Sequence, residues 1–294
     1  MKYSYLLIAS LVLNSIAFGQ ADEKSRAMNK PIPPFRIAGN LYYVGANEIS
    51  SFLITTPKGH ILLDGGFVKT APQIERNIAQ LGFKIEEVKI LLNSHAHLDH
   101  AGGLAELKKK SGAKLIASSG DAEPLRRGGR NDFRFGDTLI FPPVEVDQII
   151  ADGESVRLGD QIMTAHLTPG HTRGNTTWTT KISDNGKTYD VVFAGSPTAL
   201  DYQLVGKESY PGITADFEKT FSVLKKLPCD IFLSDHGTFY WFLEKREKLL
   251  RGENPNPFID PDGYRRFINH FEKEFHDKLD AQRRAAALST RAPE

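Results

Sequence analysis

The sequence predicts one α/β domain of two similar halves, in which helices cover a sandwich of sheets. Short apolar segments bounded by turn residues alternate along the chain with segments whose apolar residues recur at helical spacing. Both halves have this mixed character, and no linker separates them. With 294 residues, 40% of them hydrophobic and 25% charged, the chain has the size and composition of an ordinary globular protein.

The first half is expected to alternate strands and helices. Its expected strands are residues 41–44, 51–56, 60–63, 89–92 and 114–117, and its expected helices are 70–81 and 104–110. Residues 118–145 are rich in Gly, Arg, Asp and Pro and have no clear period, so we expect a long surface excursion with a short helix near Ala122 to Arg126. Long loops inside compact domains are usually functional, which makes this one a candidate border of the active site.

The second half starts with strand-like segments and ends with helices. Its expected strands are residues 147–151, 155–158, 161–167, 176–182, 189–194 and 230–233, and its expected helices are 216–227, 244–250 and 264–286. The last helix carries Phe267, Phe271 and Phe275 at four-residue spacing. Such an aromatic stripe is expected to pack on the core rather than to bind a ligand.

The N-terminus has the features of a secretory signal peptide. Met1-Lys2 precedes a short apolar core, and Ala17-Phe18-Gly19 supplies small residues at the −3 and −1 positions before Gln20. The apolar core is interrupted by polar residues and is too short for a membrane anchor. We therefore expect a periplasmic or secreted protein with a signal peptide at 1–19, an N-terminal arm at 20–35 and one domain at 36–290.

Charge and cysteine content restrict the possible partners and stabilising bonds. The formal net charge is +1, from 37 basic and 36 acidic residues, and no basic block stands out, so neither nucleic acid nor an anionic membrane is an expected partner. The single cysteine, Cys229, excludes an internal disulfide, so stability must come from the core. Cys229 itself is interpreted as a small buried hydrophobic residue.

Residues 93–103 contain four strong metal-ligand types within six positions, namely His95, His97, Asp99 and His100. In an extended backbone His95 and His97 point the same way, whereas Asp99 and His100, at the turn, are free to face elsewhere. The stretch thus offers two pairs of ligands to two neighbouring positions, as a two-metal site requires. The alternatives are a single-metal site that uses part of the motif and a chance polar loop.

Two further histidines, His171 and His236, occupy similar settings. His171 lies in a turn-rich loop between two expected strands, and His236 follows the strand 230–233. Both are at strand ends, where a fold brings distant segments together at one edge. The other histidines, which lack such a context and are interpreted as structural, are His60, His166, His270 and His276.

These motifs resemble the metallo-β-lactamase superfamily from about residue 36 to 285. The matching sequences are Asp64-Gly-Gly, His95-Ala-His-Leu-Asp99-His100, Gly170-His171-Thr172 and Ser234-Asp-His236. The resemblance implies a four-layered αβ/βα sandwich with two zinc ions at one edge of the sheets. By position, it implies that the first zinc is held by His95, His97 and His171, and the second by Asp99, His100 and His236. It also implies that Asp64 supports the metal loop through hydrogen bonds without being a ligand.

Ser196 distinguishes between the subfamilies of that superfamily. Many of its hydrolases, including glyoxalase II, have a metal-bridging Asp at this position, and two β-lactamase subclasses have a zinc-binding Cys after the same strand. Ser196 together with His95 and His100 resembles the third subclass, B3, and the segment from Thr168 to Trp178 agrees with it. Asp235 is a departure from the family pattern, and the sequence leaves its role open.

The resemblance implies an exported zinc β-lactamase that hydrolyses the cyclic amide of penicillins, cephalosporins and carbapenems. Zinc lowers the pKa of bound water from about 15.7 towards roughly 7, so that hydroxide can attack the ring carbonyl. Asp99 is expected to orient this hydroxide, and Ser196 and Thr198 are expected to bind the substrate carboxylate or a zinc-held water. We expect two zinc ions, a small-molecule β-lactam substrate, a monomer, and no membrane association after signal cleavage. The alternatives are a di-metal hydrolase of another ester or lactone, and a non-catalytic zinc or ligand-binding module.

Overall fold

The computed structural model describes residue 23 and residues 26–289. The predicted signal peptide therefore lies outside the described residues. Within the described part of the chain, none of the helices combines the length and the apolar character needed to cross a bilayer.

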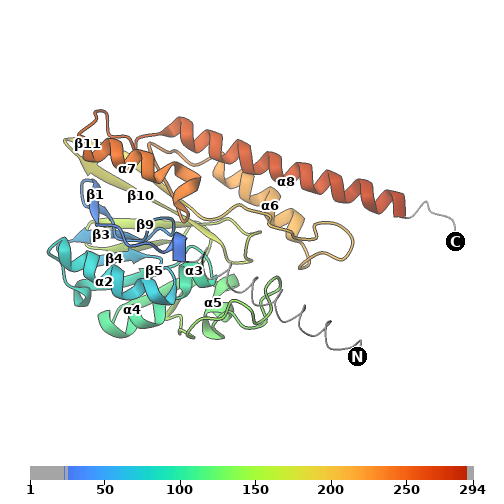
Figure 1. Ribbon diagram of the computed structural model, residues 1–294, viewed down its shortest axis with the longest axis horizontal. Helices are drawn as coiled ribbons and strands as arrows, with labels where there is room; N and C mark the ends of the chain where they lie inside the picture. The colour runs from blue at the N-terminus through green and yellow to red at the C-terminus, as the bar shows by residue number, and fades with distance from the viewer. Residues whose placement is uncertain (1–22, 24–25, 290–294) are drawn as a thin grey trace, which may run out of the picture.

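Two sheets lie face to face, with helices on the outer face of each (Figure 1). The first sheet has seven strands in the order β1-β2-β3-β4-β5-β6-β7, and the second has five in the order β12-β11-β10-β9-β8. The strands of the first sheet are β1 (Phe35–Ala38), β2 (Leu41–Tyr43), β3 (Phe52–Thr56), β4 (Gly59–Leu63), β5 (Val88–Leu92), β6 (Lys114–Ser118) and β7 (Gln148–Ile150). Those of the second are β8 (Ser155–Leu158), β9 (Gln161–Leu167), β10 (Thr176–Asp184), β11 (Lys187–Ala194) and β12 (Ile231–Ser234).

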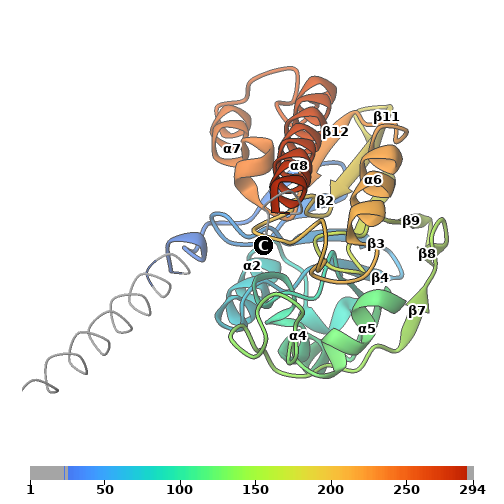
Figure 2. The same cartoon turned by 90° about the vertical axis from the view of Figure 1, so that its right-hand side faces the viewer.

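Helices complete the four layers (Figure 2). Those against the first sheet are α2 (Ala71–Gln80), α4 (Leu104–Ser111) and α5 (Ser119–Arg126). Those on the side of the second sheet are α6 (Ile213–Leu224), α7 (Phe242–Leu250) and α8 (Pro261–Ser289). Short helical segments lie in the connections: η1 (Val68–Thr70), η2 (Ile85–Glu87), α3 (Leu98–Ala101) and η3 (Gly237–Tyr240). The predicted sandwich of sheets covered by helices is confirmed.

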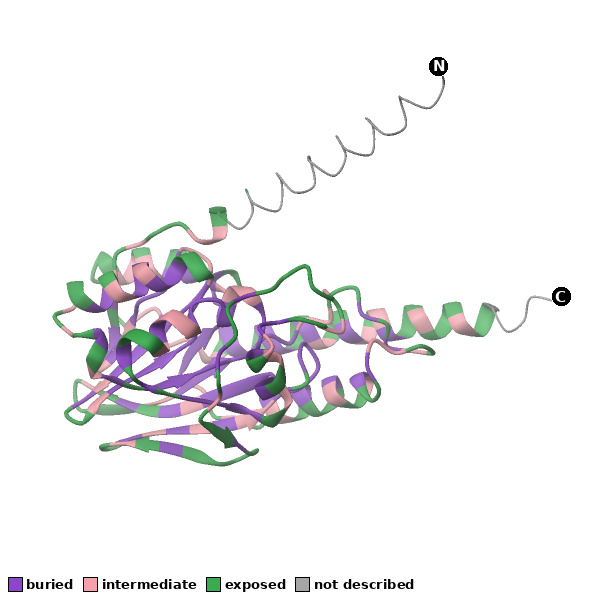
Figure 3. Cartoon of the chain, turned by 90° about the horizontal axis from the view of Figure 1, so that it is seen from below, coloured by how far each residue is buried: buried purple, intermediate pink, exposed green. Residues whose placement is uncertain are grey.

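Two cores hold the layers together. Between the sheets, Phe52 of β3 meets Phe193 of β11 with ring centroids 5.0 Å apart, and Trp178 of β10 is fully buried beside them. Between the first sheet and its helices, apolar residues such as Ile74 and Leu107 are fully buried. The facing surfaces of both sheets are accordingly buried, whereas the C-terminal part of α8 is mostly exposed (Figure 3).

Parallel strand pairs determine which loops meet. Strands β4, β5, β6 and β7 pair in parallel, and so do β11 and β12. The carboxyl ends of parallel strands lie at the same edge of a sheet, so the loops that follow them share that edge. The ligand-rich stretch follows β5, Ser196 follows β11, and His236 follows β12.

The aromatic stripe of the last helix packs on the core, as predicted. Phe267, Phe271 and Phe275 are 2%, 9% and 1% exposed. The ring of Phe275 lies 5.2 Å from that of Phe217 and 5.7 Å from that of Phe221, both on α6. Phe275 thus joins α8 to α6, and the rest of the stripe packs on β12 and η3.

Several short elements were not predicted, among them α3, β1, η2 and η3. Residues 98–101 form the one-turn helix α3, so Asp99 and His100 are helical rather than at an open turn. Strand β1 was not predicted; it directly follows the proline-bearing arm, and its pairing with β2 is irregular between Arg36 and Ala38. The strands β8 and β9 have the predicted bounds.

Candidate metal centre

A cavity of about 700 Å³ opens at the sheet edge where β5, β11 and β12 end. Its polar lining includes six of the candidate site residues, namely His97, Asp99, His171, Ser196, Thr198 and His236. Its apolar lining includes Phe135 and Leu139, which belong to the long excursion after α5. The expectation that this excursion borders the site therefore agrees with the structure.

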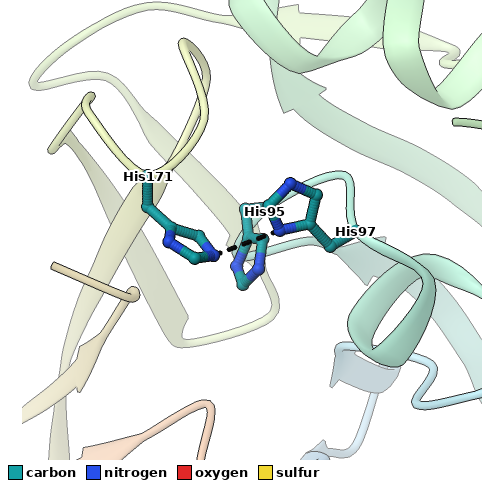
Figure 4. Close-up of side chains that lie close together, drawn as sticks. All are labelled: His95, His97 and His171. Carbon is teal, nitrogen blue, oxygen red and sulfur yellow. Dashed lines mark hydrogen bonds between the residues drawn. The ribbon is translucent and has the colours of Figure 1, made fainter. Parts of the chain in front are cut away.

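His95, His97 and His171 form the first group of possible ligands. All three are buried, and one ligand atom of each lies within 4.8 Å of the others. The Nδ1 atom of His97 is 3.1 Å from Nε2 of His171 (Figure 4). The loop that follows β5 supplies the first two residues, and the loop between β9 and β10 supplies the third.

Asp99, His100 and His236 form a second group, again with ligand atoms within 4.8 Å of one another. The Nε2 atoms of His100 and His236 are 3.2 Å apart, and Asp99 Oδ2 is 3.4 Å from the first and 3.6 Å from the second. The two groups are adjacent, because the rings of His95 and His100 lie 4.3 Å apart between centroids.

The donor set of each group suits zinc, which binds imidazole nitrogen and carboxylate oxygen. Burial lowers the pKa of His95 well below its usual value, and lowers that of His97 to about 4 and that of His171 to about 3. These three imidazoles are therefore neutral at pH 7, which is the form that binds a metal. A neutral imidazole has one nitrogen with a free lone pair, so without a metal one of the two nitrogens facing each other at 3.1 Å donates a proton to the other. A cation between them can be bound by both lone pairs in place of that proton, so the residues fit a bound cation.

Charge in the second group also favours a cation. Burial alone would raise the pKa of Asp99, but the imidazoles of His100 and His236 hold it well below its usual range. Burial alone would lower the pKa of His100, but the Asp99 carboxylate outweighs it and raises that pKa to about 9. In the metal-free protein a proton on His100 thus supplies the positive charge that the carboxylate attracts, and a metal cation can replace it.

The loop that carries His171 depends on a glycine. Gly170 has φ of +137°, and an added Cβ there would lie 2.7 Å from the ring of Phe217. Its N–H donates to the carbonyl of Thr172 at 2.9 Å, which closes the turn around His171. A side chain at position 170 would therefore displace either this loop or α6.

Asp64 lies outside both groups and holds the loop after β5. Its Oδ1 accepts hydrogen bonds from the N–H of Ser94 at 2.7 Å and from Nδ2 of Asn93 at 2.9 Å. Its Oδ2 is 3.8 Å from Nδ1 of His100. Burial raises the pKa of Asp64 to about 6. These contacts are those expected of a residue that supports ligands without binding the metal itself.

Ser196 and Thr198 both line the cavity, and their hydroxyl oxygens are 3.1 Å apart. The hydroxyl and the carbonyl of Thr198 each lie 2.9 Å from Nδ1 of His171. With Nδ1–H donating to Thr198, the Nε2 atom of His171 is left to face His97. This orienting contact of Thr198 was not predicted.

Asp121 is a further residue of the site that the sequence did not reveal. Its side chain is buried, and its Oδ2 accepts hydrogen bonds from the N–H of Ala96 and the hydroxyl of Thr172, both at 3.0 Å. It thereby joins the loop of His95 and His97 to the loop of His171. Its only sequence signal, an acidic residue in the first turn of a short helix, is too common to be informative.

The remaining histidines and the cysteine lie elsewhere. Among the described residues, the possible metal-binding groups include none of His60, His166, His270, His276 and Cys229. The Nε2 atom of His166 forms a hydrogen bond with the Thr179 hydroxyl at 2.9 Å. Cys229 is partly buried and packs against the core.

Comparisons with known proteins agree with this geometry. The family model for the metallo-β-lactamase superfamily matches residues 44–236, more than half of the chain. The FEZ-1 metallo-β-lactamase from Legionella gormanii has a similar structure, with a TM-score of 0.84, 43% identity, and coverage of 87% of this chain and 98% of that one. BJP-1, a subclass B3 metallo-β-lactamase of Bradyrhizobium japonicum, gives a TM-score of 0.82 at 38% identity, covering 88% of this chain and 98% of that one.

More distant sequence relatives include other hydrolases. A hydroxyacylglutathione hydrolase of Methylobacterium sp. (strain 4-46) is 27% identical over 113 residues, which are 38% of this chain and 35% of that protein. A UPF0173 metal-dependent hydrolase of Anaeromyxobacter sp. (strain K) is 29% identical over 39% of this chain and 38% of its own length. These curated relatives are thus matched over little more than a third of their length. From the family match and the shared fold, the chain belongs to the metallo-β-lactamase superfamily.

Proposed function

We propose that the protein is a di-zinc β-lactamase of the B3 type that opens the cyclic amide of penicillins, cephalosporins and carbapenems. The observation that carries the proposal is the convergence of six ligand side chains in two adjacent groups, four of which line one cavity. The structural neighbours support the substrate class, because they are β-lactamases that match this chain at about 40% identity over most of its length.

Each group supplies the ligands for one zinc ion. His95, His97 and His171 would hold the first, and Asp99, His100 and His236 would hold the second. Zinc in such a site supplies Lewis-acid chemistry, since it polarises a carbonyl and makes hydroxide available at neutral pH.

Asp99 is the residue of these groups suited to proton handling. Its side chain is 24% exposed, more than that of His236 at 17%, and it lines the cavity. Because its pKa is held well below the usual range, it is a carboxylate at neutral pH and can accept a hydrogen bond from an attacking water. Once it has accepted the proton of that water, the same side chain would pass it to the amide nitrogen when the C–N bond breaks.

Substrate binding is assigned to two hydroxyls and to the apolar walls. Ser196 and Thr198 can donate hydrogen bonds to the substrate carboxylate, while Thr198 accepts one from His171. Phe135 and Leu139 would contact the apolar parts of the substrate. A cavity of about 700 Å³ is of the size that holds a drug-sized molecule.

The second candidate is a di-metal hydrolase of another ester or lactone. The match to hydroxyacylglutathione hydrolase favours it, since that enzyme belongs to the same superfamily. Ser196 argues against it, because many such hydrolases resemble one another in having a bridging Asp at this position.

Export, assembly and domain limits complete the proposal. A signal peptide at residues 1–19 would direct the protein to the periplasm or out of the cell, followed by an arm at 20–35 and one domain at 36–290. A monomer is proposed, with small molecules as its only partners.

The test is a hydrolysis panel with the purified protein. We expect rapid turnover of a chromogenic cephalosporin, a penicillin and a carbapenem, its loss with a chelator, and its recovery with zinc. A thioester of glutathione and an acyl-homoserine lactone serve as competing substrates. His97→Ala should abolish turnover, whereas His166→Ala, a histidine outside both groups, should not. Faster turnover of the thioester or lactone than of any β-lactam would establish the second candidate instead.

A further inference from the structure

We propose that Asp235 is a positioning residue that accepts a hydrogen bond from Nδ1 of His95 and so turns the Nε2 atom of His95 toward the first zinc. Asp235 was the departure from the family pattern in the sequence. The inference rests on the proposed zinc binding but does not depend on the substrate.

Asp235 is held in one orientation by its first carboxylate oxygen. Oδ1 accepts hydrogen bonds from the Ser234 hydroxyl at 3.0 Å and from the N–H of His236 at 2.9 Å. The carbonyl of Asp235 also accepts a hydrogen bond from the N–H of Ser50 at 2.9 Å. The residue is 3% exposed, so water does not compete for these contacts.

The second carboxylate oxygen faces His95. Oδ2 is buried, and none of the described residues offers it a well-aligned donor, yet it lies 3.4 Å from Nδ1 of His95. A buried carboxylate oxygen without a partner is costly, so a donor at this position is expected. In a neutral imidazole one nitrogen carries the proton and the other has the free lone pair. A proton on Nδ1 of His95 therefore leaves Nε2 as the metal ligand.

Ser94 is the competing partner, since its hydroxyl oxygen is 3.3 Å from the same Nδ1 atom and is better aligned for a hydrogen bond than the carboxylate. A hydrogen bond to an ionised acceptor is roughly twice as strong as one between neutral groups. The carboxylate is therefore the stronger partner, and the hydroxyl can turn its own proton elsewhere.

Asp235 also lies next to both metal groups. One ligand atom each of His95, His100 and Asp235 lies within 4.8 Å of the others. Through Oδ2 the residue contacts the first group, and through Oδ1 it fixes the backbone of His236 in the second. Its charge thus adds to the field that attracts a cation at either position.

The test compares zinc affinity in two isosteric variants. In Asp235→Asn the amide oxygen can keep the contacts of Oδ1, while the amide NH₂ places a donor against Nδ1–H of His95. The matched control is Asp230→Asn at the other end of β12, where the carboxylate accepts a hydrogen bond from the N–H of Asp190 at 2.9 Å. Zinc is titrated into metal-free protein against a chromophoric chelator, and the number of ions bound is measured.

We expect Asp235→Asn to bind two zinc ions with the affinity of the first weakened about 10- to 100-fold. Asp230→Asn should bind within about twofold of the unmodified protein, because its amide lies far from the ligands. In ¹⁵N-histidine spectra of the unmodified protein, His95 should carry its proton on Nδ1, and Asp235→Asn should reduce that tautomer. The spectrum of the unmodified protein tests the hydrogen bond even if the variant does not fold.

Four results would overturn the inference. Unchanged zinc affinity in Asp235→Asn, or a proton on Nε2 of His95 in the unmodified protein, would exclude the orienting role. A larger loss in Ser94→Ala than in Asp235→Asn would assign that role to the hydroxyl. Loss of one bound zinc in Asp235→Asn would make Asp235 a ligand. An unmodified protein that binds no zinc would instead contradict the proposed function.

Discussion

Replacing Asp64 separates the hydrogen bonds that hold the metal loop from the charge that accompanies them. Asp64→Ala leaves two buried donors without an acceptor, the N–H of Ser94 and the side-chain amide of Asn93. Each such group costs about 1–3 kcal/mol, so the two together cost about 2–6 kcal/mol. Asp64 also has φ of +63°, a region that Asp tolerates better than Ala, which adds about 1 kcal/mol.

Asp64→Asn is the matched variant. An amide oxygen in the place of Oδ1 keeps both acceptor contacts, and Asn tolerates the same backbone conformation. Because burial raises the pKa of Asp64 to about 6, its ionisation costs the folded protein free energy at neutral pH, and an uncharged amide avoids that cost. We therefore expect Asn to lower the free energy of unfolding by less than about 1.5 kcal/mol.

The assay is urea unfolding of all three proteins in a chelator, so that metal binding does not contribute to the difference. We expect Asp64→Ala to lose about 3–7 kcal/mol, a large part of the stability of an ordinary domain. A loss below about 1 kcal/mol, or an equal loss in the Ala and Asn variants, would refute the reasoning.

Three further substitutions test other parts of the structure. Phe275→Ala removes a ring that is 1% exposed and should lower the free energy of unfolding by about 3–5 kcal/mol in denaturant titrations; a loss below about 1 kcal/mol would mean that the aromatic stripe is not core. Trp178→Phe removes the N–H that donates to the carbonyl of Asn93 at 3.0 Å, so it should lower the free energy of unfolding by about 1–3 kcal/mol and weaken zinc binding. Unchanged stability and unchanged zinc affinity would exclude a link between β10 and the metal loop. Arg134 and Asp201 form a bidentate ion pair between the loops on either side of the cavity, so Arg134→Ala should raise the KM about two- to fivefold. A double variant with the two residues exchanged should recover part of the lost substrate affinity. An exchanged pair no better than Arg134→Ala would rule out this role.

The regular elements could be predicted because their signals are local. The alternation in 155–158 and 161–167 and the four-residue spacing of Phe267, Phe271 and Phe275 depend only on neighbours in the sequence. The elements that were missed are short. The one-turn helix α3 has too few residues to repeat a helical period, and β1 follows the proline-bearing arm and pairs irregularly with β2. Both form because pairing and packing in the folded chain stabilise them.

The residues of the site also fall into a predicted and an unpredicted set. The spacing His95-x-His97-x-Asp99-His100 singled out ligands because metal sites need several donors of these types close together. The residues that hold those ligands make long-range contacts that no spacing encodes. Asp121 reaches Thr172, 51 positions away in the sequence, and Asp235 reaches His95 from the opposite sheet. An isolated Asp gives no sign of which donor it will meet.

Zinc titration of the metal-free protein, with hydrolysis of a carbapenem followed at each addition, tests the central claim most directly. If the two groups of ligands form one di-zinc β-lactamase site, hydrolysis should be absent without metal and should rise until two zinc ions are bound per chain. Binding of two zinc ions without hydrolysis of any β-lactam would contradict the proposed activity, and absence of zinc binding would contradict the metal centre itself.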